Sequence, residues 1–119
     1  MRHRLEFRTV WLSDVHLGSP QCRAVELLEF LLALDAERVY LVGDIIDFER
    51  LHRRWHWPAA HTRVLERLEQ MARTGTDVVW VPGNHDRVLR SMIGQRIGAI
   101  RIQRYANHVT AGGDHLLVT

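Results

Sequence analysis

The stretch that decides the fold is Val39-Tyr40-Leu41-Val42-Gly43-Asp44, four largely apolar residues stopped by a glycine and an acid. A short apolar run that ends in a turn signal is typical of a buried strand followed by a loop. Similar runs lie on either side of it, at residues 7–13 before Asp-Val-His and at residues 78–81 before Pro-Gly-Asn-His-Asp. We therefore expect three buried strands, each followed by polar residues.

Helical periodicity fills the gaps between these strands. Ser19-Pro20 is a helix-start signal, and apolar residues keep helical spacing from there to about Asp35. A second helix is expected from Pro58 to its stop at Gly75, whereas residues 47–57 show no clear period. An order of strand, helix and strand predicts parallel pairing.

The last third of the chain predicts shorter elements. Residues 87–93 are expected to form a short helix closed by Gly94, and the turn Gly112-Gly113-Asp114 links short strands that begin at residues 100, 106 and 115. The predicted fold class is α/β, with the order β-α-β-α-β followed by a short β meander. All of it belongs to a single domain, residues 1–119.

Composition bounds the class of protein. The chain is 46% hydrophobic and 25% charged, which is ordinary for a folded domain. Its sixteen basic residues are all arginine against fourteen acids, and a net charge of +2 is too small to imply nucleic acid. Arginine suits phosphate recognition, although most of these side chains are expected to be solvated. A single cysteine, no signal peptide and no membrane-spanning apolar stretch predict a cytoplasmic protein.

Chemistry-bearing side chains follow each of the three strands. Asp14 and His16 follow the first, Asp44 the second, and Asn84 the third. An acid after a strand is often only a turn residue, but parallel strands would bring all these groups to one edge of the sheet. Oxygen and imidazole ligands without thiolate suit Mn²⁺, Fe or Zn²⁺. Two such ions held ~3.5–4 Å apart can clamp the oxygens of a phosphoryl displacement.

Three segments resemble the first three signature blocks of the calcineurin-like metallophosphoesterases: Asp14-Val15-His16, residues 43–47 (Gly-Asp-Ile-Ile-Asp) and residues 83–86 (Gly-Asn-His-Asp). The resemblance implies the amino-terminal half of a four-layer αββα sandwich that binds two divalent metal ions, with manganese foremost and iron or zinc as alternatives. Further metal-ligand histidines of that family would lie beyond residue 119, so the chain is expected to be a truncated domain.

The same resemblance implies a role for each matching residue. Asp14 and His16 would hold the first ion, Asp44 would bridge both ions, and Asn84 would hold the second. His85 would stabilise the transferring phosphoryl group or protonate the leaving oxygen. Asp47 would orient His85 from behind.

Longer stretches are similar to one branch of that family, the bacterial UDP-2,3-diacylglucosamine pyrophosphatase-like proteins: Ser13–Arg23, Leu41–Phe48, Arg53–Pro58 and Pro82–Arg90. This implies hydrolysis of a pyrophosphate in lipid A synthesis by a metal-bridging hydroxide. The partner would be a phosphorylated small molecule or nucleotide-lipid, with peripheral contact to the inner membrane. His85 departs from the branch, whose best-studied form has arginine there. His108 and His115 match no later motif of the family.

Residues 51–57 interleave arginine, histidine and tryptophan. Arg53, Arg54 and Trp55 could grip a pyrophosphate and stack on a base or rest at a membrane interface. Alternatively, this is a surface loop whose tryptophans pack over the following helix. Both interpretations remain open from the sequence.

Three functional hypotheses follow. The first is a phosphoesterase or pyrophosphatase, and the second is a general phosphodiesterase or nucleotidase of the same family. The third is a non-catalytic, truncated metal- or phosphate-binding module. For these 119 residues alone we expect at most about one loosely held metal ion, and self-association through an uncovered apolar sheet face.

Overall fold

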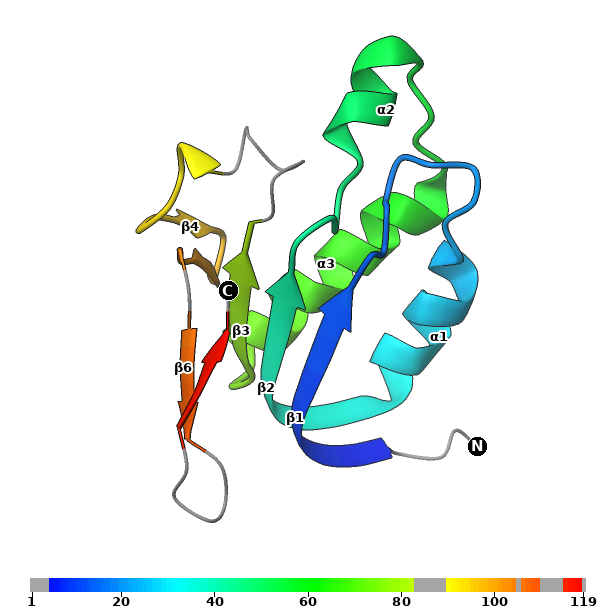
Figure 1. Cartoon of the computed structure of the whole chain (residues 1–119). Helices are drawn as coiled ribbons and strands as arrows, with labels where there is room; N and C mark the ends of the chain where they lie inside the picture. Colours follow the sequence, from blue (N-terminus) through cyan, green and yellow to red (C-terminus); the bar gives the residue numbers. More distant parts are fainter. Residues whose placement is uncertain (1–4, 83–89, 105, 110–114, 119) are drawn as a thin grey trace.

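The computed structural model of the protein describes residues 5–82, 90–104, 106–109 and 115–118. Figure 1 shows a main sheet covered on one face by helices, with a small second sheet beside it. The elements in chain order are β1 (Leu5–Ser13), α1 (Ala24–Ala33), β2 (Leu34–Val42), α2 (Phe48–Arg53), α3 (Ala59–Arg73), β3 (Asp77–Val81), β4 (Arg96–Ile97), β5 (Ile100–Ile102), β6 (Ala106–Val109) and β7 (His115–Val118).

The main sheet has five strands in the order β1-β2-β3-β5-β4. Only β4 runs antiparallel to its neighbour. Leu41 of β2 lies opposite Leu12 on one side and Trp80 on the other, so β1, β2 and β3 end at the same edge of the sheet. The predicted β-α-β-α-β order and its parallel pairing are confirmed.

One hydrophobic core lies between the sheet and the two long helices, α1 and α3. Its fully buried side chains come from both layers: Leu31, Val39, Leu41, Val64, Leu68, Val78 and Trp80. Arg67 joins the two helices as well, because its Nε donates to the carbonyl oxygen of Leu31 at 2.9 Å. This core fixes the positions of β1, β2 and β3, and therefore of the loops that follow them.

The opposite face of the sheet carries a smaller cluster of Tyr40, Val79 and Val81. β2 therefore has buried residues on both faces, with Val39 and Leu41 on one face and Tyr40 on the other. β1 lies at the edge of the sheet, and its Phe7 and Trp11 are 51% and 46% exposed. Trp11 stacks on Tyr40 with ring centroids 5.7 Å apart.

The predicted limits of the first helix are wrong at both ends. α1 begins at Ala24 rather than at Ser19-Pro20, because Ser19 closes a separate turn in which its Oγ accepts the Gln21 N–H at 3.2 Å. α1 ends at Ala33 and β2 begins at once, five residues before the predicted strand. Pairing of Leu34 with Leu5 of β1 overrides the helical spacing of Leu34.

The second helix is confirmed, and α2 was missed. α3 starts after Pro58 and ends at Arg73, just before Gly75 with its φ of 116°. α2 has no buried residue and so leaves no periodic signal in the sequence. It is set by its N-cap instead, since Asp47 Oδ1 accepts the Arg50 N–H at 3.0 Å.

The short strands differ from a simple meander in one respect. β5 joins the main sheet parallel to β3 and is flanked by the two-residue β4, which was not predicted. β6 and β7 pair with each other antiparallel. The turn at residues 112–114 and residues 87–89 of the predicted short helix lie outside the described residues. None of the described helices has the length and apolarity needed to cross a bilayer.

Candidate metal centre

Two loops meet at the carboxyl ends of β1 and β2. Asp14 directly follows β1, His16 lies two residues further on, and Asp44 is the second residue after β2. Each offers one potential ligand atom, and these atoms all lie within 4.8 Å of one another. The convergence predicted for these three side chains is therefore observed, well inside the separation that one ion or an ion pair can span.

The two loops are held side by side by a continuation of the parallel pairing. The N–H groups of His16 and Leu17 donate to the carbonyl oxygens of Asp44 and Ile45, at 3.0 and 2.8 Å. The Asp47 N–H donates back to the carbonyl oxygen of Leu17 at 2.8 Å. Leu17 and Ile45 are almost fully buried, which locks the loops onto the core. The strands thus position the candidate ligands through backbone hydrogen bonds.

The backbone at the candidate ligands is unusual. Within the described ranges, the non-glycine residues with positive φ are Asp14 at 53°, His16 at 54° and Asp44 at 36°. Such conformations cost about 1–3 kcal/mol each and persist where the surroundings enforce them. They are the same three residues that converge. Strain that coincides with converging ligand atoms indicates a site built for function.

His16 has a different partner at each ring nitrogen. Its Nδ1 lies 3.4 Å from Asp47 Oδ2, a long hydrogen bond, and its Nε2 lies 3.8 Å from Asp14 Oδ1. A carboxylate behind a histidine selects the tautomer and leaves the other nitrogen free to bind a metal. Asp47 was expected to orient His85; in the structure it contacts His16 and caps α2, and His85 lies outside the described residues.

The surroundings of one Asp44 carboxylate oxygen indicate whether a cation fits at this site. Asp44 Oδ1 is buried and, among the described groups, has no hydrogen-bond partner. A buried carboxylate oxygen without a partner is costly, and a bound cation would satisfy it. Two carboxylates and one imidazole also match the donor preference of Mn²⁺, Fe and Zn²⁺. The residues present therefore fit a divalent metal ion, with exposed Asp14 on the solvent side.

The remaining predicted site residues lie either outside the described part of the chain or at the end of α2. Asn84 and His85 lie outside the described residues. Arg53, Arg54 and Trp55 are exposed at the end of α2, and α2 rises from the same edge of the sheet as the two loops (Figure 1). Trp55 is 73% exposed. Trp57, in contrast, packs at the start of α3, where its Nε1 donates to Thr62 Oγ1 at 2.8 Å.

Sequence reasoning missed His61. Its ring is only 3% exposed, and its Nδ1 accepts the N–H of Gly18 at 2.9 Å, two residues after His16. The signal was available in the helical stripe of α3, because His61 stands three residues before Val64 on the buried face. A histidine on the buried face of a helix needs a hydrogen-bond partner, and here the partner is the metal-site loop.

Three comparisons with known proteins show what the chain is similar to. The family model described as calcineurin-like phosphoesterase matches residues 7–115. The UDP-2,3-diacylglucosamine hydrolase of Porphyromonas gingivalis is 28% identical over 106 residues, which cover 83% of this chain and 38% of that protein. The crystal structure of nuclease MPE from Pseudomonas putida is 19% identical with a TM-score of 0.43, over 77% of this chain and 45% of that one. The chain thus spans 38% of the length of the curated relative it matches.

Proposed function

This chain belongs to the calcineurin-like phosphoesterase family, a family of hydrolases, and from that premise we propose that it carries the metal-binding end of a phosphoester hydrolase. The observation that carries the proposal is the convergence of Asp14, His16 and Asp44 at the carboxyl edge of a parallel sheet. When bound, a pair of divalent ions supplies Lewis-acid stabilisation of the charge that develops on phosphoryl oxygens.

Each described residue has a defined task in this proposal. Asp14 and His16, from the loop after β1, would hold the first ion, and Asp44, from the loop after β2, would serve both ions. Asp47 would accept a hydrogen bond from the Nδ1–H of His16 and so leave Nε2 as the nitrogen that could bind a metal. From the family resemblance, we further propose that Asn84 holds the second ion and that His85, oriented by Asp47, acts on the leaving oxygen.

For the substrate we propose a pyrophosphate bond in a UDP-linked lipid, with manganese as the metal. Support comes from the resemblance to a UDP-2,3-diacylglucosamine hydrolase and from exposed Arg53, Arg54 and Trp55 at the end of α2, a helix that rises from the same edge of the sheet as the two loops. Arginine forks suit phosphate, and an exposed tryptophan suits a base or a membrane interface. The second candidate is a simpler phosphodiester or nucleotide, for which the same metal pair would serve.

The test combines metal binding with a substrate panel on the whole gene product. Mn²⁺ binding is followed by electron paramagnetic resonance, and hydrolysis is compared for UDP-2,3-diacylglucosamine, bis(p-nitrophenyl) phosphate and UMP. Release of UMP from the first substrate would support the lipid assignment, and cleavage of only the simpler esters would favour the second candidate. His85→Ala should retain Mn²⁺ and lose roughly 10²–10⁴ in turnover. Absence of Mn²⁺ binding by the wild type would refute the proposal.

A further inference from the structure

His61 connects the candidate metal centre to α3. It lies in the first turn of that helix and is separated from Gly18 by 43 residues in the sequence. Its Nδ1 nevertheless accepts the Gly18 N–H at 2.9 Å in a buried environment. Two aromatic rings hold the imidazole edge-on, Trp57 with centroids 5.4 Å away and His56 at 5.9 Å. The ring therefore has a fixed orientation and a single described backbone partner.

We propose that His61 is a positioning residue, a neutral imidazole whose Nδ1 anchors Gly18 and thereby holds Asp14 and His16 in their metal-binding conformation. This inference rests on the proposed metal site and adds a residue from outside the two loops. In this proposal His61 binds neither the metal nor the substrate. It acts through the backbone of residues 16–18.

The packing around Gly18 explains why an acceptor is needed there. Gly18 has a φ of 98°, and a Cβ on it would lie 2.7 Å from Leu51 Cγ. The glycine backbone is thus pressed against α2 on one side and α3 on the other, where water does not reach its N–H. A buried N–H without a partner is costly, and His61 supplies the acceptor.

The hydrogen bond completes a continuous set of anchors along the loop. His16 N–H and Leu17 N–H are bound to the second loop, the Leu17 carbonyl oxygen accepts from Asp47, and Gly18 N–H is bound to His61. His16 sits in this run with a φ of 54°, a conformation that needs such restraint. Without the last anchor, residues 17 and 18 can rotate and His16 can relax away from Asp14 and Asp44.

The protonation state of His61 agrees with an acceptor role. Burial, and then the charge of neighbouring His56, lower the pKa of His61 below its ordinary value. A neutral imidazole has one acceptor nitrogen, whereas the protonated ring has none. At neutral pH the ring therefore carries its proton on Nε2 and presents Nδ1 to Gly18.

Two substitutions at residue 61 separate the hydrogen bond from the packing. His61→Phe keeps a planar ring without an acceptor, and His61→Asn places an amide oxygen close to the position of Nδ1. Trp57→Phe is the matched control, because it removes the indole bond to Thr62 from the same cluster and leaves Gly18 untouched. Mn²⁺ dissociation constants are measured for all three variants of the whole gene product, with thermal unfolding to verify folding.

We expect His61→Phe to weaken Mn²⁺ binding by ~10–100-fold, the usual effect of losing an outer partner of a metal site. His61→Asn should stay within a few-fold of wild type, and so should Trp57→Phe. Equal losses in His61→Phe and His61→Asn, or wild-type affinity in His61→Phe, would overturn the inference while leaving the proposed function intact. A wild type that binds no Mn²⁺ would overturn both.

A nitrogen-15 spectrum of the wild-type protein covers the case in which His61→Phe does not fold. Two-bond couplings to the ring protons identify which nitrogen of His61 is protonated. The inference expects protonated Nε2 and bare Nδ1, together with slow hydrogen exchange at the Gly18 amide. Protonated Nδ1, or rapid exchange at that amide, would refute it.

Discussion

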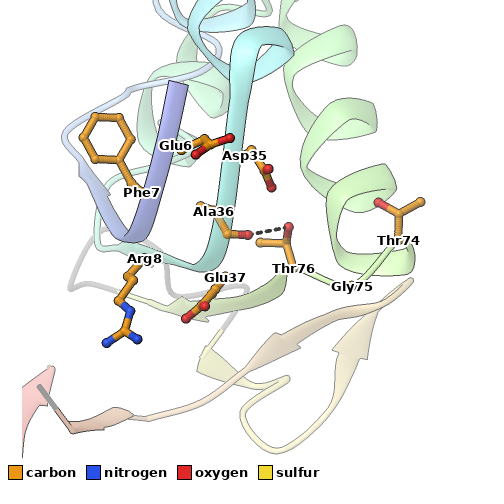
Figure 2. Close-up of a pocket in the computed structure, with 9 residues that line it drawn as sticks. All are labelled: Glu6, Phe7, Arg8, Asp35, Ala36, Glu37, Thr74, Gly75 and Thr76. Carbon is orange, nitrogen blue, oxygen red and sulfur yellow. Dashed lines mark hydrogen bonds between the residues drawn. The ribbon is translucent and has the colours of Figure 1, made fainter. Parts of the chain in front are cut away.

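Acidic side chains gather at both ends of the parallel sheet, and the two gatherings differ in how the backbone holds them. At the carboxyl end, Asp14 and Asp44 converge with His16 in strained loops. At the amino end, Glu6, Asp35 and Glu37 line an open pocket together with residues 74–76 (Figure 2). Their carboxylates stand on extended strand residues, and all three side chains are exposed.

The difference shows what a metal site requires beyond acidic residues. Exposed carboxylates such as those of Glu6 and Glu37 are accessible to water, so their solvation does not depend on a bound ion. The polar groups around the amino-end pocket are also satisfied locally, as where Thr76 Oγ1 donates to the Ala36 carbonyl oxygen at 2.9 Å (Figure 2). At the carboxyl end, Asp44 Oδ1 is buried without a described partner. Burial, convergence and strain together distinguish the two ends.

The largest expected effect is a loss of Mn²⁺ affinity when a carboxylate at the carboxyl end is neutralised, compared with the same change at the amino end. Asp44→Asn keeps the shape and tolerates positive φ, but removes the charge proposed to serve both ions. Mn²⁺ affinity should fall by about 100-fold or more, exceeding the usual loss of an outer partner. Glu37→Gln, the matched change at the amino end, should leave Mn²⁺ affinity unchanged in the same calorimetric titration.

The melting temperature without metal distinguishes a lost ligand from a damaged fold. In Asp44→Asn it should be unchanged or higher, because one of two nearby carboxylates is gone and their repulsion with it. A large loss of Mn²⁺ affinity in Glu37→Gln would break the comparison. So would wild-type affinity in Asp44→Asn.

Substitution of two glycines with positive φ tests how tightly the backbone is packed at the two ends of the sheet. Gly18 adjoins the metal-site loop, and Gly75 lines the amino-end pocket. A Cβ on Gly18 would lie 2.7–2.9 Å from Leu51, whereas a Cβ on Gly75 would meet nothing within 4 Å. Gly75→Ala should cost only the backbone term of about 1–2 kcal/mol. Gly18→Ala should cost about 2–5 kcal/mol, because overpacking is added to that term.

Urea unfolding of both variants measures this difference in free energy. Gly18→Ala should also weaken Mn²⁺ binding, since relief of the clash with Leu51 moves the loop that carries His16. Gly75→Ala should bind Mn²⁺ as the wild type does. Equal destabilisation in the two variants would mean that Leu51 moves aside without cost.

The fold was predictable wherever one physical signal dominated. The apolar runs of β2 and β3 and the amphipathic stripe of α3 fixed the parallel core, because burial leaves a periodic trace in the sequence. α2 has no buried face and depends on a single cap at Asp47, so periodicity could not find it. The limits of α1 were missed because Leu34 suits a helix or a strand equally, and only pairing with β1 decides between them.

The candidate metal ligands could be predicted from the sequence, but the residues that position them could not. Asp14, His16 and Asp44 follow apolar strands, and parallel pairing then forces them together. His61 contacts Gly18 across 43 residues, and Asp47 contacts His16 from its place as the N-cap of α2. The stripe of α3 marks His61 as facing the core, but which groups these residues contact depends on how loops and helices pack, and local sequence patterns do not contain that information.

A smaller effect should appear in the pH dependence of stability. Burial and the charge of His56 lower the pKa of His61 in the folded protein, whereas the unfolded chain has the ordinary value of about 6.5. Below that pH, His61 is protonated in the unfolded chain but stays neutral in the folded protein down to its lower pKa. The free energy of unfolding therefore falls as pH falls. Urea unfolding from pH 7.5 to 5 should show a steeper decline in the wild type than in His61→Asn. Trp57→Phe, which keeps His61, should retain the steeper decline, and parallel curves for wild type and His61→Asn would contradict the assignment.

The smallest effect on stability is expected at an ion pair near the amino end of β3. There the guanidinium of Arg101 in β5 donates hydrogen bonds to both carboxylate oxygens of Asp77. Its Nη2 lies 2.7 and 2.8 Å from the two carboxylate oxygens, and its Nε lies 3.2 Å from Oδ1. Arg101→Lys replaces this planar fork by one ammonium nitrogen, which cannot make the same two parallel hydrogen bonds. The side chains of Arg101 and Asp77 are 37% and 42% exposed, so solvent screens most of the interaction. We expect the free energy of unfolding to fall by about 0.2–1 kcal/mol at low salt, and the difference from wild type to shrink in 1 M NaCl. Because this pair holds β5 against β3 and not the loops after β1 and β2, Mn²⁺ affinity should not change. A loss of Mn²⁺ affinity in Arg101→Lys would show that the two ends of the sheet are coupled, and the separation between them would no longer hold.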